Sequence, residues 1–347
     1  MVRAHSLSRI LLIPILASVV ALTAAAATSD ESARVTAGDR QAAKQAKVQR
    51  HARAASTPKG LSMHARQVLK GRTQQAPSTQ ASVPPPGSQT RYPGDLQYHG
   101  GAVLESVKSH AIFMRPNGVC EIPACWGNPE GFLRDLGKSD LIHVTDQYIG
   151  STSNNRYTVG QRAFVDFTPQ ANPFTDDDML AVVHSVAKKI GKTGYGHIYH
   201  VFLPPGTDEC FDSTFSVCYS PDNFDTFFYC AYHGYADFQD IGHVLYSVEP
   251  SQAAPGCADS QLPDGSGLPN GVLVDSTDDT LSHELIEAIT DPDLDAWWNS
   301  VGLGMFGQEI ADECIFLDGP GAFQVGKHFW AAQTEYSNAD HACIIGP

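Results

Sequence analysis

Eight cysteines, all of them beyond residue 119, constrain the fold of this 347-residue chain more than any other feature. An even number of cysteines in an exported protein favours disulfide bonds over a thiol-ligated metal. The chain also lacks a C-x-x-C pair, which argues against a zinc-finger or thioredoxin-type domain. We therefore expect four disulfides, and we assign them by favouring short loops. This assignment joins Cys120 to Cys125, Cys210 to Cys218, Cys230 to Cys257, and Cys314 to Cys343.

The N-terminus has the organisation of a secretory signal peptide. Arg3 and Arg9 precede a mostly apolar run at 10–22, and small residues follow up to Ala27. A charged region, an apolar region and a small-residue cleavage site together predict removal of residues 1–27. The alternative is a membrane anchor, but the apolar run is short for spanning a bilayer and contains a proline. The sequence therefore predicts a secreted protein.

Charge divides the chain near residue 94. Residues 1–94 carry 13 Lys and Arg against 3 Asp and Glu, and residues 95–347 carry 10 against 35, within a total net charge of −15. So acidic a domain argues against nucleic acid or an anionic membrane surface as its main partner. After signal cleavage we expect no contact with a membrane. The acidity suits a secreted protein in a mildly acidic medium, or one that binds cations.

The basic segment 28–94 is rich in Ala, Gln, Ser, Lys and Arg, almost lacks aromatic residues, and ends in a proline-rich stretch. Such a composition buries too little apolar surface to offset the entropy of ordering, and it predicts disorder. A weak helix could form at about 40–53. Two interpretations stay open: a linker, and a basic pro-segment that lies on the acidic domain.

Residues 95–347 are enough for one globular domain with a full core. A helix is predicted between Thr175 and Gly191, because acids occupy its first turn and lysines its last. Buried strands are predicted at 197–203 and 241–248. Because strands and helices mix without regular alternation, we expect an α+β fold with a mixed sheet, stapled by disulfides.

A helix predicted at 277–290 carries the most specific chemistry. His283 and Glu287 are four residues apart, so they project from one face, and Glu284 is adjacent. This is the H-E-x-x-H pattern of zinc proteases with a carboxylate in place of the second histidine. His and Glu both ligate zinc, which lowers the pKa of its bound water to about 7, and Glu284 would accept the proton. The alternative is an ordinary amphipathic helix with a polar, solvent-facing side.

A third ligand could come from the segment 309–314. Glu309 and Asp312 are three residues apart and share a face if this segment forms a helical turn. We favour Asp312 as the ligand, with Glu309 close behind, and the other acid could accept a hydrogen bond from His283. The alternative is a pair of solvated acids beside Cys314. A carboxylate in place of the second histidine weakens zinc binding and alters metal preference.

Calcium is a second candidate ion. Asp291, Asp293 and Asp295 alternate along the chain, and a further acidic cluster occupies 176–178. The first run lacks the glycine and the distal glutamate of an EF-hand loop. It could still form a loose calcium site on the surface.

His233 is a weaker candidate for the same cleft. It could stabilise an oxyanion as a catalytic residue, although a histidine in such a context is more often packed or hydrogen-bonded. His200 lies in a predicted strand and is expected in the core. The sequence has no G-x-S-x-G motif, and all eight cysteines can pair, so neither a serine nor a cysteine nucleophile is favoured.

From residue 98 to its C-terminus the chain resembles the phosphate-induced protein 1 family, the EXORDIUM-like proteins. The resemblance rests on YHGG at 98–101, CAYH at 230–233, SHELIEAITDP at 282–292, Trp297, and EIADEC at 309–314. It implies a secreted or cell-surface protein whose fold is related to zinc-dependent peptidases, without an assigned reaction. The long basic N-terminal segment differs from the plant members, and so does the aspartate at the end of the third motif. We therefore do not transfer their role in growth.

Taken together, these features favour a secreted zincin-like metalloprotein that acts as a zinc-dependent peptidase. His283, Glu287 and Asp312 would hold the metal, and Glu284 would be the general base. Its partner would be an extracellular peptide or protein substrate, or a cell-wall component. The alternative is a non-catalytic extracellular protein, for binding or growth, that keeps a structural ion.

Overall fold

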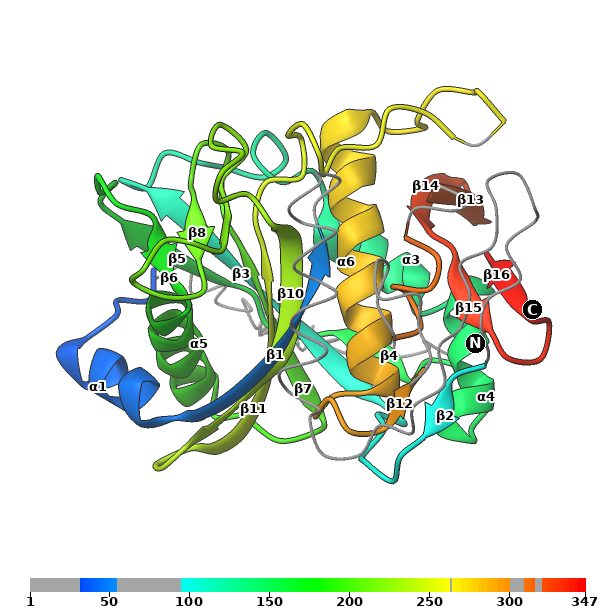
Figure 1. The fold of residues 1–347 in the computed structure, drawn as a ribbon, viewed down its shortest axis with the longest axis horizontal. Helices are drawn as coiled ribbons and strands as arrows, with labels where there is room; N and C mark the ends of the chain where they lie inside the picture. The colour runs from blue at the N-terminus through cyan, green and yellow to red at the C-terminus, as the bar shows by residue number, and fades with distance from the viewer. Residues whose placement is uncertain (1–31, 55–94, 263, 300–308, 316–319) are drawn as a thin grey trace, which may run out of the picture. The chain divides into compact units, whose positions relative to one another are not determined.

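A mixed sheet of seven strands forms the centre of the fold (Figure 1). The strand order is β1-β10-β11-β7-β3-β4, and β5 also pairs with β3. β10 is antiparallel to both of its neighbours, whereas the pairs from β11 to β5 are parallel. The strands are β1 (Lys47–Ala54), β3 (Val107–Pro116), β4 (Tyr157–Val159), β5 (Ala163–Phe167), β7 (His197–Phe202), β10 (Tyr229–Phe238) and β11 (Gly242–Glu249). The predicted mixed sheet is confirmed, and β7 and β11 match two predicted strands.

The computed structural model describes residues 32–54, 95–262, 264–299, 309–315 and 320–347. The predicted signal peptide therefore lies outside the described residues, as does the proline-rich end of the basic segment. No helix within the described ranges is both long enough and apolar enough to cross a membrane.

Helices cover both faces of the sheet. α1 (Ala37–Gln45) and α5 (Asp176–Ile190) pack on one face, and α3 (Pro129–Leu136) and α6 (Val272–Thr290) pack on the other (Figure 1). Side chains of β3 alternate between the two cores: Ile112 belongs to the cluster beneath α5, and Phe113 to the cluster beneath α6. Burial on both faces explains why the central strands β3, β7, β10 and β11 are mostly apolar.

α5 forms where its caps predict. Asp178 closes a capping box by accepting hydrogen bonds from the backbone N–H and the hydroxyl of Thr175, at 3.0 and 2.9 Å. Gly191 ends the helix in the left-handed region, with φ of 70°. The first acid of the helix, Asp176, is buried instead of facing solvent.

α6 begins earlier than predicted, at Val272, and every residue from Asp275 to Thr290 is buried. Its neighbours are the sheet, α3 and the hairpin strand β14 (His328–Gln333). An ordinary amphipathic helix would expose its polar side, so this interpretation does not hold for α6. The polar side chains of α6 must instead find partners inside the protein.

Short elements complete the domain. They are β2 (Gln97–Tyr98), η1 (Leu141–Thr145), α4 (Asp146–Ile149), β6 (Phe174–Thr175), β8 (Glu209–Cys210), β9 (Cys218–Tyr219), β12 (Trp297–Trp298), β13 (Pro320–Val325), β15 (Glu335–Ser337) and β16 (Ala342–Ile344). β13 pairs with β14 and β15 pairs with β16 beside α6 and η1, at the C-terminal end of the chain (Figure 1).

The eight cysteines form four disulfides. They join Cys120 to Cys125, Cys210 to Cys218, Cys230 to Cys257, and Cys314 to Cys343. These are the pairs that the short-loop assignment predicts. The last of them anchors the acidic segment 309–315 to β16.

The basic N-terminal segment differs from the expected disorder at residues 32–54. α1 packs on α5, and β1 adds a strand to the edge of the sheet beside β10 (Figure 1). Composition predicted no order because the segment offers little apolar surface. Ion pairs with the acidic domain add to this packing and strand pairing, among them Arg50 with Asp176 at 2.9 Å and Arg53 with Asp279 at 2.6 Å.

Candidate metal centre

Four segments bring three histidines and three carboxylates together in the interior. We call this group the metal centre, and its members come from β1, β10, α6 and the turn at 309–315. They are His51, His233, His283, Glu287, Glu309 and Asp312. All of them except His51 are fully buried. Predicted ligands from the helix and from the acidic turn thus lie side by side.

The orientation of His283 is set by a glutamine on β14. Gln333 donates its amide N–H to the carbonyl of Ala311 at 2.5 Å, so its Oε1 is left to accept from His283 Nδ1 at 3.0 Å. His283 Nδ1 therefore carries a proton. In the neutral ring, Nε2 then presents a lone pair toward Glu287 Oε1, 3.2 Å away, and Asp312 Oδ1, 3.8 Å away.

Two carboxylates facing one imidazole nitrogen favour a positive charge between them, either a proton or a metal ion. Buried carboxylates are paired, protonated or bound to a metal, because burial of an isolated charge is costly. Within the described residues, Glu309 Oε1 has no hydrogen-bond partner, and His283 Nε2 has only the ion-pair contacts with Glu287 and Asp312. A metal ion fits this donor set, and the hydrogen bond to Gln333 is the kind of outer support that metal-bound histidines usually have.

Two overlapping groups of side chains could hold an ion. One consists of His51, Glu287, Glu309 and Asp312, and the other of His233, Glu284 and Glu287. Within each group, one ligand atom per residue lies within 4.8 Å of all the others. Glu287 belongs to both groups, whereas the predicted ligand His283 belongs to neither. Glu287 Oε1 also accepts the backbone N–H of Asp312 at 3.2 Å.

The charges in the metal centre act strongly on one another. Burial alone would raise the pKa of Glu287, but His283 lowers it to about 2. Burial would lower the pKa of His51, but Glu309 and Asp312 raise it to about 9. Ionised carboxylates and protonated histidines thus stabilise one another in the metal centre.

Glu284 has a different environment. It is fully buried, and no hydrogen-bond partner within the described residues reaches either of its carboxylate oxygens. Burial, followed by the charges of Glu287 and Glu249, raises the pKa of Glu284 well above its ordinary value. A carboxyl group beside a candidate metal, with a raised pKa, is suited to accept and return a proton.

His233 lies closer to the carboxylates than its predicted role in stabilising an oxyanion requires. Its Nε2 is 3.3 Å from Glu309 Oε2 and 3.4 Å from Glu287 Oε2. These two acids, working against burial, raise the pKa of His233 well above its ordinary value. The geometry makes His233 a candidate ligand of the metal centre.

His51 is the member that sequence analysis missed. The register of β1 on β10 places it directly opposite His233, so both side chains point to the α6 side of the sheet. Its Nε2 is 2.6 Å from Asp312 Oδ2, and its Nδ1 is 3.5 Å from Glu309 Oε2. The only available signal was a histidine between two arginines in the basic segment, which has no motif associated with it.

The predicted calcium run has other roles. Asp291 Oδ1 accepts the backbone N–H of Ala296 at 2.6 Å, and Asp293 Oδ1 is 3.1 Å from His243 Nε2. These acids and Asp295 do not form a three-ligand group within the described residues. In the second acidic cluster, Asp176 pairs with Arg50.

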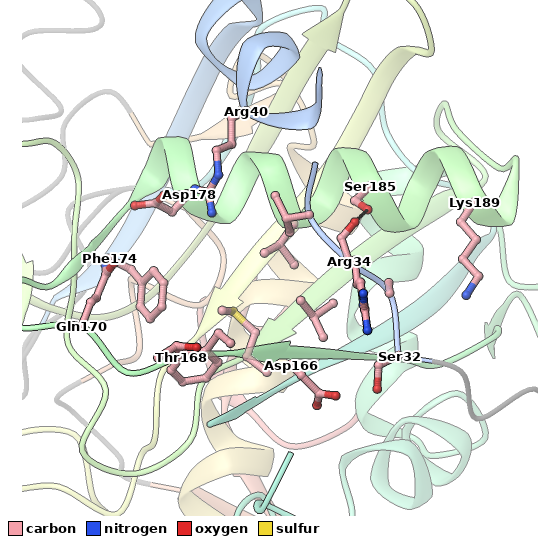
Figure 2. Close-up of a pocket in the computed structure, with 16 residues that line it drawn as sticks. Ser32, Arg34, Arg40, Asp166, Thr168, Gln170, Phe174, Asp178, Ser185 and Lys189 are labelled. Atoms are coloured by element: carbon pink, nitrogen blue, oxygen red, sulfur yellow. Dashed lines mark hydrogen bonds and ion pairs between the residues drawn. The ribbon is translucent and has the colours of Figure 1, made fainter. Parts of the chain in front are cut away.

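A surface hollow of about 1140 Å³ lies away from this chemistry, between α5 and the strand β5 (Figure 2). α5 lines it with Asp178, Ser185 and Lys189, and the N-terminal segment lines it with Arg34 and Arg40. No member of the metal centre lines this hollow. It therefore offers no access to the buried ligands.

Comparison of the chain with protein-family models, with curated proteins and with solved structures gave no match in any of the three. A functional conclusion therefore depends on the geometry of the metal centre.

Proposed function

We propose that the protein is a secreted, zinc-dependent peptidase with a zincin-like active site. The observation that supports it most is the fixed tautomer of His283, whose Nε2 faces the carboxylates of Glu287 and Asp312. These three residues would hold the metal, and Glu309 and His233 lie close enough to add ligands. The four disulfides favour an oxidising compartment, in agreement with the predicted signal peptide.

The choice of zinc follows from the donor atoms. Calcium and magnesium prefer oxygen ligands alone, whereas this centre offers imidazole nitrogens together with carboxylates. Zinc accepts both, and catalytic zinc sites usually have three protein ligands.

The mechanism follows from the surroundings of each side chain. When bound, zinc would supply a water molecule with a pKa of about 7 and polarise the carbonyl of a scissile bond. Glu284 would take up the proton released in the attack and return it to the leaving amine. Burial raises the pKa of Glu284, which favours the return of the proton, and the positive charge of a bound metal would favour the carboxylate form that the first transfer needs. Gln333 would hold His283 in place throughout.

A second candidate function is a non-catalytic binding protein with a structural ion. The observation that favours it is that β1 covers the metal centre. Its residue His51 could add a further ligand, and the His51 side chain is only 12% exposed. Structural zinc sites are closed by a fourth protein ligand.

Substitution of Glu284 separates the two functions. We expect Glu284→Gln to bind zinc as wild type does, and to lose hydrolysis of a quenched-fluorescent peptide library by about a hundredfold or more, because the proton acceptor is gone. Zinc content is measured by elemental analysis. Each protein is also tested with the additional substitution Arg53→Ala, which should loosen β1 and expose the metal centre, because Arg53 pairs with Asp279.

Glu313→Gln is the matched control. This neighbouring glutamate is buried too, but its Oε1 accepts from Asn299 at 3.1 Å. It should keep the activity. Equal hydrolysis by wild type and Glu284→Gln would remove Glu284 from the mechanism. No hydrolysis by any zinc-loaded form would leave the binding protein as the function.

A further inference from the structure

β1 fits the edge of β10 as an extended peptide would. It pairs antiparallel along the strand, from Lys47 opposite Asp237 to Arg53 opposite Ala231. Opposite Arg50, β10 has a glycine, Gly234, and therefore no side chain. A Cβ at this position would lie 2.7 Å from Arg50 Cα and closer still to the Gln49 carbonyl oxygen. The strand edge next to the metal centre is thus shaped for the close approach of another backbone.

Each basic side chain in the middle of β1 meets a buried acid. Arg50 Nη1 lies 2.9 Å from Asp176 Oδ2, and its guanidinium group lies 4.5 Å from the ring centroid of Phe211. Arg53 Nη2 lies 2.6 Å from Asp279 Oδ2 on the opposite face of the sheet. Between them, His51 reaches into the metal centre. The strand paired with β10 thus meets a buried acid on each face of the sheet.

The covering segment contributes little to the hydrophobic core. Among its described residues, 32–54, the fully buried apolar side chains are three alanines, Ala33, Ala43 and Ala52, and four more apolar side chains pack against the core while partly buried: Val35, Ala42, Ala46 and Val48. No disulfide links it to the rest of the protein, because every cysteine lies beyond residue 119. Its attachment thus depends mainly on the strand ladder and on ion pairs, which another basic chain could reproduce.

We propose that the edge of β10 is a binding groove for extended basic peptides, and that β1 occupies it as an internal competitor that keeps the metal centre closed. This proposal rests on the proposed peptidase function, and it adds a substrate class and a means of regulation. The groove takes a peptide as an added antiparallel strand, with basic side chains where Arg50 and Arg53 now lie. His51 of β1 then blocks access to the ligands.

A binding experiment on the full chain tests the groove without depending on hydrolysis. The probe is a fluorescein-labelled peptide with the β1 sequence KVQRHARA, and Glu284→Gln protein keeps it intact. We expect Glu284→Gln with Arg50→Ala and Arg53→Ala to bind the probe at least about tenfold more tightly than Glu284→Gln alone, because its own strand competes less well. A probe with glutamate at both arginine positions should bind to neither protein, and added salt should weaken binding.

Equal binding of the probe by the two proteins, with equal zinc content and cooperative melting in both, would overturn the proposal. Should the triple variant fail to fold, hydrogen exchange in the wild type decides. The backbone amides of β1 should exchange faster than those of β11, because β1 detaches while the rest of the sheet stays folded. Equal exchange rates in the two strands would show that β1 is a permanent strand of the domain. Probe binding without peptidase activity in any form would keep the groove and reject the proposed function.

Discussion

At the scale of single residues, the hydrogen bond from His283 to Gln333 decides which ring nitrogen faces the carboxylates. We expect Gln333→Ala to lower zinc affinity about 10- to 100-fold while the protein stays folded, because the ring loses its fixed tautomer and orientation. Competition with a chromogenic chelator measures the affinity. Gln324→Ala on the adjacent strand β13 is the control, since the Gln324 side chain donates to the nearby carbonyl of Gly326 in an exposed turn. Equal affinity of Gln333→Ala and wild type would contradict this role.

His200 makes the stability of the protein depend on pH. It is buried in the core as predicted, and burial lowers its pKa from 6.5 to about 3. The unfolded chain therefore takes up this proton at higher pH than the folded chain does, and stability is lost as pH falls from about 6.5 toward 3. At pH 5 the loss is about 2 kcal/mol.

Comparison with His200→Asn isolates this effect. Asparagine can keep the hydrogen bond that His200 Nδ1 makes with Ser247, at 2.8 Å, without titrating. Urea unfolding at pH 7.5 and at about pH 5 should show the wild type losing roughly 2 kcal/mol more than the variant. A loss of the same size in both proteins would assign the acid sensitivity to other groups.

At the scale of elements, the pairing of β1 with β10 depends on Gly234. We expect Gly234→Ala to loosen β1, because the added methyl group would collide with the backbone of Gln49 and Arg50. Trypsin should then cleave after Arg50 and Arg53 more rapidly than in wild type. Gly196→Ala is a matched control, since no atom within 4 Å meets its Cβ. Unchanged cleavage in Gly234→Ala would show that β1 can shift without detaching.

The disulfide between Cys314 and Cys343 holds the acidic turn of the metal centre. Removing it by Cys314→Ser with Cys343→Ser should cost about 3 kcal/mol of stability and also weaken zinc binding, because Glu309 and Asp312 lose their anchor. Removing Cys120–Cys125, which closes a short loop, should leave zinc affinity unchanged. Denaturant unfolding and chelator competition measure the two effects. An equal loss of zinc affinity in both double variants would contradict a local role.

Local periodicity and spacing made part of the centre predictable. His283 and Glu287 follow from the helix repeat, Glu309 and Asp312 from a second short repeat, and the disulfides from short loops. His51 could not be found in this way, because its position depends on the register of β1 against a strand far along the chain. The same is true of the buried acids, which composition alone assigns to a solvated surface.

At the scale of the whole molecule, the basic N-terminal segment and the acidic domain bind each other through ion pairs. The basic segment at 32–54 supplies cations for two acids that the domain buries, Asp176 and Asp279, and three further buried carboxylates, Glu287, Glu309 and Asp312, lie in the metal centre. An acidic composition thus has a specific use here: it creates sites for cations, whether these are arginine side chains or a metal ion. The prediction of disorder is wrong for residues 32–54, where charge pairing adds to limited apolar burial.

The most direct test of a zinc centre is the metal content of the purified full-length protein, measured by elemental analysis in wild type and in His283→Ala. His110→Ala is the control, because His110 is also buried but pairs with His197 away from the centre. We expect about one zinc per chain in wild type and in His110→Ala, and almost none in His283→Ala. No metal in the wild type, or calcium that persists in His283→Ala, would contradict the proposed centre.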